Sequence, residues 1–195
     1  TAALLRFWTM LAHYHAQIWH AAPPARSLGV SEPTVRRYLD LLSGLFMVRQ
    51  LQPWHANLRK RQVKAPKVYV RDSGILHELL GVRSATDLLA HPKCGDSWEG
   101  YVIEEALRLL QPDEAYFWAT HNGAELDLLL IKDGRRLGIE CKRVDAPRLT
   151  PSMRRFLDAN ILFLAGYSSS SPGHDLIALG RAERCVLRAS AYAIE

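Results

Sequence analysis

The most constraining feature of this chain is a pair of short apolar runs joined by a tight turn. Residues 125–131 and 136–141 are rich in Leu and Ile, and Asp133-Gly134 lies between them. An Asp-Gly step between two such runs is a strong short-range signal for a β-hairpin, because both residues accept positive φ angles. We therefore expect two adjacent antiparallel strands.

Charged side chains occupy one face of this hairpin. Side chains alternate across a strand, so Glu125 and Asp127 share one face of the first strand, and Glu140 and Lys142 share one face of the second. The opposite face is expected to be the core face, and its members are Leu126, Leu128, Leu130, Ile139 and Cys141.

This charged face has two interpretations. Three carboxylates and an ammonium group held so close together cost free energy unless a cation neutralises them. Carboxylate oxygens suit Mg²⁺ or Mn²⁺, which predicts a divalent-cation site. The alternative is a solvated sheet face, on which charged and core residues simply alternate.

The hairpin belongs to a larger α/β pattern over residues 95–195. Helical spacing of apolar residues predicts a helix over 98–110, and Thr150-Pro151 predicts the start of another over 150–158. Further strands are expected at 116–119 and 161–167, with one or two edge strands in the tail. We place the domain boundary in the turn-rich segment 81–95.

Residues 1–80 predict a winged helix-turn-helix domain. A first helix carries apolar residues from Leu4 to Trp19 and ends before Pro23-Pro24. A short helix, a turn at Gly29 and a second helix capped by Ser31 follow. Strands at 45–51 and 67–70 flank a basic loop, as in a wing, and Asp72 caps a helix that ends at Leu80.

Basic residues gather in the second helix and in the loop. The exposed residues of such a helix enter the major groove of DNA, whereas wing residues contact phosphates. The predicted DNA contacts are Ser31, Thr34, Arg36, Arg37, Arg59, Lys60, Arg61, Lys64 and Lys67. Trp54 and His55 are expected either to stack on the nucleic acid or to pack within the protein. Winged helices also act as hinges between proteins, and basic loops are often only solvated, so both alternatives stay open.

Composition narrows the class of protein. The chain is 48% hydrophobic and carries a net charge of +5, which suits a globular protein with a polyanionic partner. Three widely spaced cysteines argue against a disulfide framework or a cysteine zinc site and favour a reducing cytoplasm. No apolar run is long enough to span a bilayer, so we expect no membrane association. His13, His15 and His20 lack ligand spacing and are expected to be surface or partly buried residues.

The order of the acidic residues resembles that of the PD-(D/E)xK phosphodiesterases. An acidic residue on a helix, an Asp on a strand and Glu-x-Lys on the next strand correspond to Glu99, Asp127 and Glu140-Cys141-Lys142. The resemblance implies that Glu99, Asp127 and Glu140 hold the metal, and that Lys142 orients or activates the attacking water. A capping box with Asp96 explains Glu99 equally well, and Glu104 and Glu105 are substitutes on the same helix.

Nearly the whole chain looks like the C-terminal region of a family of bacterial and archaeal P-loop ATPases of unassigned function. The matching segments are 28–42, 53–58, 67–74, 97–100 and the two acidic strands. Members of that family contain an ATPase module, a winged helix and a restriction-endonuclease-like domain. The resemblance therefore implies an α/β fold with an N-terminal winged helix-turn-helix and a nuclease-like domain around a mixed central sheet.

The same resemblance sets the functional expectations. The chain begins at Thr1 and contains no GxxxxGK[ST] loop, so we expect a longer protein in which ATP binds only outside these residues. The expected function is metal-dependent phosphodiester hydrolysis on DNA. The alternatives are a non-catalytic DNA- or protein-binding module coupled to the ATPase and a plain transcriptional regulator, and a homo-oligomer is compatible with all three.

Overall fold

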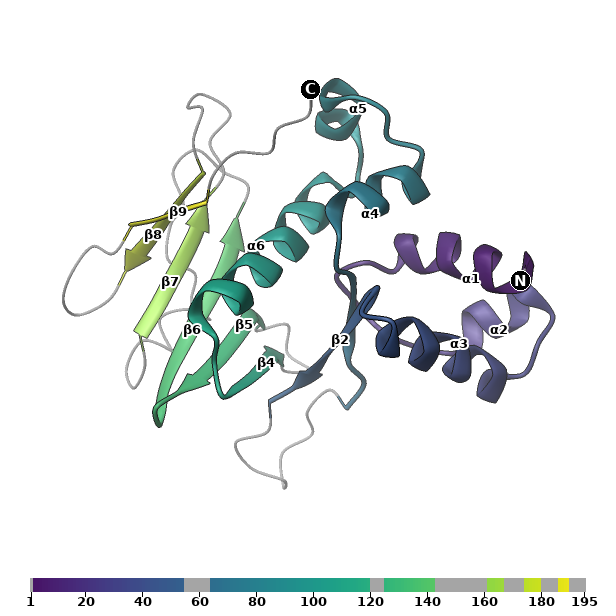
Figure 1. Cartoon of the computed structure of the whole chain (residues 1–195), viewed down its shortest axis with the longest axis horizontal. Coiled ribbons are helices and arrows are strands. Elements are labelled where there is room, and N and C mark those ends of the chain that lie inside the picture. Colours follow the sequence, from purple (N-terminus) through teal and green to yellow (C-terminus); the bar gives the residue numbers. More distant parts are fainter. Residues whose placement is uncertain are drawn as a thin grey trace. The chain divides into compact units, whose positions relative to one another are not determined.

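The computed structural model describes residues 2–54, 64–119, 125–142, 161–166, 174–179 and 186–189, with only the backbone from Lys142 onward (Figure 1). The chain divides into two compact units. The first unit contains Thr1–Leu51 and Ala65–Tyr101, and the second contains Gln52–Lys64 and Val102–Glu195. The boundary expected at 81–95 differs from this division, which falls between Tyr101 and Val102 inside helix α6 (Cys94–Leu110).

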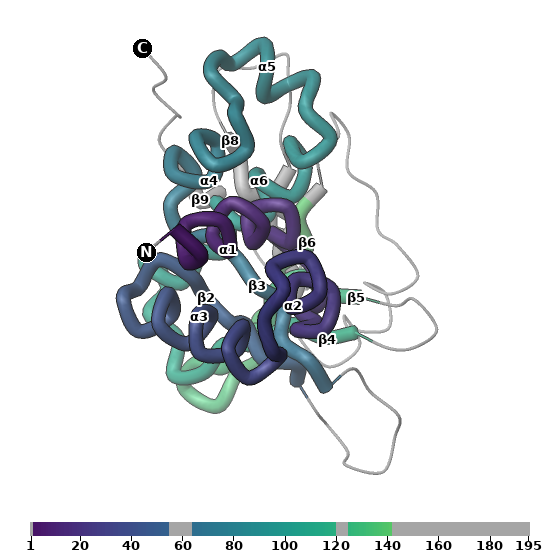
Figure 2. Tube along the Cα trace, turned by 90° about the vertical axis from the view of Figure 1, so that its right-hand side faces the viewer, coloured from purple at the N-terminus to yellow at the C-terminus, as the bar shows by residue number. Residues whose placement is uncertain are grey.

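Three helices form one end of the first unit, as Figures 1 and 2 show: α1 (Ala2–His13), α2 (Ala22–Leu28) and α3 (Glu32–Gly44). The prediction that the first helix runs on to Trp19 is wrong. The helix ends at His13, Ala16 has a φ of 62°, and β1 (Gln17–Ile18) follows. Pro23-Pro24 lie in the first turn of α2, where a missing N–H costs nothing, so they start the second helix instead of ending the first.

The turn between α2 and α3 forms as predicted. Gly29 ends α2 with a φ of 66°, a left-handed conformation that glycine adopts without steric cost. The Ser31 hydroxyl accepts a hydrogen bond from the Thr34 backbone N–H at 3.4 Å, which confirms its role as the N-cap of α3. The buried face of α3 packs into a core whose members include Phe7, Leu11, Val35, Leu39 and Leu42.

A small antiparallel sheet completes the first unit together with two further helices. Its strand order is β1-β3-β2, with β2 at Val48–Pro53 and β3 at Lys67–Val70. Asp72 caps α4 (Ser73–Leu80) by accepting from the Ile75 N–H at 2.8 Å, as predicted. A short helix, α5 (Ala85–Ala90), lies in the segment that was expected to lack regular structure.

The second unit is a mixed sheet that follows α6 (Cys94–Leu110). Its six described strands are β4 (Glu114–Ala119), β5 (Glu125–Lys132), β6 (Arg135–Lys142), β7 (Ile161–Gly166), β8 (His174–Leu179) and β9 (Val186–Ala189). They lie in sequence order, parallel between β6 and β7 and antiparallel elsewhere. Gln52-Pro53 at the end of β2 add a short parallel pairing with β4. The chain is therefore a mixed α/β protein, as expected. The predicted helix over 150–158 lies outside the described residues.

The β5–β6 hairpin turns at the predicted residues. Asp133 and Gly134 have φ angles of 49° and 71°, the positive values that a tight two-residue turn requires. Leu128 lies opposite Ile139, and Lys132 lies opposite Arg135. None of the helices in the described part of the chain is both long and apolar enough to cross a membrane.

Candidate functional site

The two central carboxylates of the predicted site lie on neighbouring strands of the second unit. The β5–β6 register runs to Leu128 opposite Ile139, and these two side chains share one face. Because side chains alternate, Asp127 and Glu140 both belong to the other face, one position further along each strand. The hairpin therefore places Asp127 and Glu140 on the same face of adjacent strands, as the sequence pattern predicts.

Asp127 reaches across to β6 with its side chain. Its Oδ2 accepts a hydrogen bond of 2.7 Å from the backbone N–H of Cys141. That amide is the one that links Cys141 to Glu140, so a carboxylate oxygen of Asp127 lies at the peptide unit that carries Glu140. Lys142 ends β6 and pairs with Gly166 of β7, but its side chain is outside the described residues.

Burial separates this arrangement from a solvated hairpin. Asp127 is 7% exposed and Glu140 is 5% exposed, although the alternative interpretation requires both to face water. Leu129, the next residue of β5 on the same face as Asp127, is also fully buried, so β5 is covered on both faces along its middle. Glu125, at the start of the strand, is exposed. Two like charges in such surroundings repel each other unless hydrogen bonds or a cation compensate them.

The donor set suits one small hard cation. Mg²⁺ is commonly bound by one or two carboxylates and keeps several of its waters, so two carboxylates are enough for a site of this type. Among residues with described side chains, no group of three or more His, Cys, Asp or Glu is arranged to hold a metal ion. The fit therefore rests on Asp127 and Glu140.

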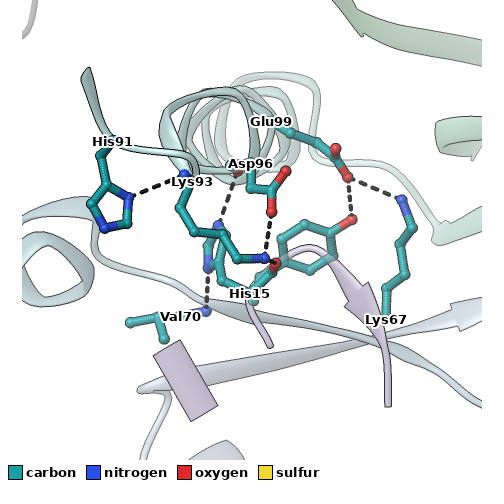
Figure 3. Close-up of polar contacts among 8 residues, drawn as sticks. His15, Lys67, Val70, His91, Lys93, Asp96 and Glu99 are labelled. Atoms are coloured by element: carbon teal, nitrogen blue, oxygen red, sulfur yellow. Dashed lines mark hydrogen bonds and ion pairs between the residues drawn. The ribbon is translucent and has the colours of Figure 1, made fainter. Parts of the chain in front are cut away.

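Glu99, the helix ligand implied by the resemblance, has partners inside the first unit. Its Oε1 accepts hydrogen bonds from the Tyr69 hydroxyl at 2.7 Å and from the Lys67 ammonium group at 3.1 Å (Figure 3). The side chains of Lys67 and Glu99 are only 6% and 15% exposed. This geometry gives Glu99 a structural role, which joins the start of α6 to strand β3.

Lys67 is correspondingly placed away from solvent. A phosphate contact requires an exposed ammonium group, and this one is buried against Glu99. Its burial follows from its position in β3, where Val68, Tyr69 and Val70 are also buried. We therefore remove Lys67 from the set of DNA contacts.

His15 lies in the same network and is fully buried, whereas a surface or partly buried position was expected. It is 1% exposed, its Nδ1 accepts from the Val70 N–H at 3.0 Å, and its Nε2 donates to the Asp96 carbonyl at 3.1 Å (Figure 3). The pKa of His15 is lowered to about 3, chiefly by burial and also by the nearby Lys93 ammonium group, although the hydrogen bond to the Asp96 carbonyl raises it. The imidazole is therefore neutral at physiological pH.

Of the other predicted DNA contacts, Ser31, Thr34, Arg36 and Arg37 lie on α3 or at its N-cap, and Lys64 precedes β3. Ser31, Arg36 and Arg37 are exposed, and Thr34 is partly buried. Arg36 forms an ion pair with Glu32 at 3.5 Å, but both side chains are well exposed, so the pair leaves the guanidinium accessible. Lys64 is exposed, while Arg59, Lys60 and Arg61 lie outside the described residues.

Comparisons with known proteins find similarity over both halves of the chain. Residues 1–86 match the model of a domain of unknown function, DUF8612, and residues 94–173 match another, DUF4143. The uncharacterised proteins Mb2031c of Mycobacterium bovis and Rv2008c of Mycobacterium tuberculosis are each 50% identical to this chain over 156 residues. The match covers 80% of this chain but 35% of each relative, so the chain spans about a third of their length. No solved structure matches significantly.

One contact in the second unit was not anticipated from the sequence. The guanidinium of Arg136, at the start of β6, lies over the indole ring of Trp54, 5.4 Å from the ring centre. The backbone N–H of Trp54 donates to the Phe117 carbonyl of β4 at 2.7 Å, which fixes the backbone at Trp54. A signal was present in the sequence, because Arg135-Arg136 directly follow the hairpin turn.

Proposed function

We propose that the second unit is a nuclease-like domain that hydrolyses phosphodiester bonds in DNA with the help of Mg²⁺ or Mn²⁺. The observation that carries the proposal is the buried pair of carboxylates, Asp127 and Glu140, on adjacent strands followed by Lys142. The PD-(D/E)xK resemblance supports the same assignment. Water-exposed acidic residues would not need a cation, whereas a buried pair benefits from one.

Each residue of the site would have a separate role in phosphodiester hydrolysis. Asp127 and Glu140 would hold the cation, which polarises the phosphodiester and favours deprotonation of a bound water. The hydrogen bond from the Cys141 N–H keeps the Asp127 carboxylate turned toward β6 and limits its rotation. Lys142 would add a compact positive charge that orients the attacking water or stabilises the phosphate.

The first unit is proposed to contact duplex DNA as a winged helix-turn-helix domain. The support is local: α3 follows a glycine turn, is capped by Ser31, and presents Arg36 and Arg37 to solvent. The basic segment that contains Arg59, Lys60 and Arg61 would contact phosphates.

A P-loop ATPase module is the proposed partner of these two units in a longer protein. The support comes from the family resemblance and from the relatives, of whose length the matched region covers only 35%. ATP would bind in that module and would not contact the residues described in this structure.

A second function is favoured by one specific observation. Glu99 is engaged with Lys67 and Tyr69, so the third acidic residue of the motif already has a structural task. A nuclease-like domain with an incomplete motif can serve as a non-catalytic DNA- or protein-binding module coupled to the ATPase.

Cleavage assays on this chain separate the two functions. We would incubate the chain with Mn²⁺ and linear, branched and single-stranded DNA, alongside Asp127→Ala, Glu140→Ala and Lys142→Ala. Each substitution should lower cleavage by about 100-fold or more, whereas Glu125→Ala, an exposed carboxylate on the same strand, should leave it unchanged. The same assay on the longer relative Rv2008c tests whether further domains are needed to position the DNA.

The outcomes are distinct. Cleavage that survives all three substitutions does not come from this site. If neither protein cuts any substrate in Mn²⁺, the nuclease proposal fails and the non-catalytic module is the better description.

A further inference from the structure

We infer that Trp54 and Arg136 form a binding subsite for single-stranded nucleic acid on the sheet face that carries Asp127 and Glu140. The inference rests on the proposed function of the second unit, because it names the form of substrate and two residues that would hold it. It adds a contact that the acidic motif does not contain.

The first step is the face on which Arg136 lies. Residues 136, 138 and 140 alternate with 135, 137 and 139 along β6, so Arg136 shares a face with Glu140. Four residues of extended strand separate them by about 13 Å. Gly138 stands between them, so no side chain of β6 rises between the arginine and the acidic pair.

The second step is the preorganisation of the arginine. A guanidinium held over an indole ring, within about 6 Å of its centre, is restrained by the cation–π contact and can still donate its N–H groups to a phosphate. At 5.4 Å this pair meets that distance. Arg136 is exposed and Trp54 partly exposed, so solvent or a ligand reaches both.

The third step is the chemistry of the ligand. An aromatic ring beside a cation at the exposed end of a sheet face is the arrangement that stacks unpaired bases, since every base has a π-face and duplex bases are hidden in the stack. The acidic residue of β4, Glu114, accepts a hydrogen bond from the Tyr116 hydroxyl. Strand β5 separates Glu114 from Arg136, so a phosphate bound to Arg136 would lie two strands away from this carboxylate. An unpaired strand therefore fits better than a duplex.

The hairpin supplies a matched control. Arg135 is exposed like Arg136 and carries the same charge, but alternation places it on the opposite face, across from Lys132. A general electrostatic effect would respond equally to either arginine. A subsite that includes Trp54 would respond to only one.

The test measures binding of labelled oligo(dT) and oligo(rU) by fluorescence anisotropy, in EDTA so that no metal takes part. Trp54→Ala should weaken binding at least about fivefold, the loss expected for one stacked base. Arg136→Ala should also weaken binding and flatten the slope of log affinity against log salt by about 0.7, as expected for one phosphate of a single strand. Arg135→Ala should change neither quantity appreciably.

Conservative variants separate binding from folding. Trp54→Phe keeps an aromatic ring and should retain most of the affinity, and Arg136→Lys should restore the salt slope without restoring the full affinity. Thermal melting of each variant identifies any loss that comes from unfolding. The relative affinities for oligo(dT) and oligo(rU) show whether DNA or RNA is preferred.

Two results would overturn the inference. One is an equal loss in Arg135→Ala and Arg136→Ala, which would show a general charge effect. The other is unchanged binding in folded Trp54→Ala, which would show that the pair only stabilises the hairpin. Failure of the nuclease proposal is separate, because it appears as absent metal binding or cleavage while the effects of Trp54 and Arg136 persist.

Discussion

His15 is a buried residue whose two hydrogen bonds fix the protonation state and the tautomer of its imidazole ring. A backbone N–H can only donate and a carbonyl can only accept, so Nδ1 facing Val70 must be unprotonated and Nε2 facing Asp96 must carry the proton. Protonation of Nδ1 would break the first bond and place a charge in a buried site beside Lys93. The network therefore needs a neutral imidazole.

This state makes stability depend on pH. The native pKa of His15, about 3, lies below the unfolded value of about 6.5, so the unfolded chain binds more protons as pH falls through this window. The free energy of unfolding should fall by about 2 kcal/mol between pH 7 and pH 5 from His15 alone. In His15→Gln, whose amide can accept and donate in the same way without titrating, denaturant melts should lose that part of the pH dependence. Equal pH dependence in both proteins would contradict the neutral, buried imidazole.

Gly100 is the second residue on which this network depends. A Cβ at position 100 would overlap Nε2 and Cε1 of His15, whereas a Cβ at Gly95 on the same helix meets nothing within 4 Å. Gly100→Ala should therefore lower the free energy of unfolding by about 1 to 3 kcal/mol, as overpacking does. Gly95→Ala should be neutral or stabilise by up to about 1 kcal/mol, because alanine favours the helix. Chemical denaturation of both variants measures the difference, and equal stabilities would show that His15 moves aside freely.

Single residues were predictable where their effect is local. Ser31 and Asp72 cap the helices that directly follow them, and both caps form as the sequence indicates. Lys67 and Glu99 are 32 positions apart, and only the folded chain brings them together. A burial signal did exist for Lys67, because it begins the short apolar strand β3.

At the scale of elements, the β5–β6 hairpin was the most predictable part of the chain. An Asp-Gly turn and two apolar strands specify both the pairing and the register. The first helix was extended too far because apolar residues at 18 and 19 continue its spacing, although tertiary pairing draws Gln17–Ile18 into a strand with β3. Periodicity alone cannot show whether the apolar side chains at 18 and 19 continue a helix or belong to a strand.

The Lys67–Glu99 pair joins two elements, α6 and β3, and this role is testable. Glu99→Ala removes the carboxylate that pairs with the buried Lys67 ammonium group and should lower the free energy of unfolding by about 3 to 5 kcal/mol. The double variant Lys67→Met, Glu99→Leu removes both charges and should recover much of that loss. Urea denaturation of the three proteins gives the values. A single variant as stable as the parent would return Glu99 to the set of candidate metal ligands.

At the scale of the whole molecule, the mixed α/β class and the pairing of the acidic strands follow from the sequence. The burial of Asp127 and Glu140 does not, because alternation predicts one solvated face and β5 is covered on both. The division between the units within α6 was also not readable, since a continuous amphipathic helix gives no sign of a boundary.

The central claim is that Asp127 and Glu140 hold one divalent cation, and calorimetric titration with Mn²⁺ and Mg²⁺ tests it most directly. The parent chain should bind one Mn²⁺ ion, and Asp127→Ala and Glu140→Gln should each abolish measurable binding. Glu125→Gln removes an exposed carboxylate from the same strand and should bind like the parent. A parent chain that binds no metal, or binding that survives Asp127→Ala, would contradict the account.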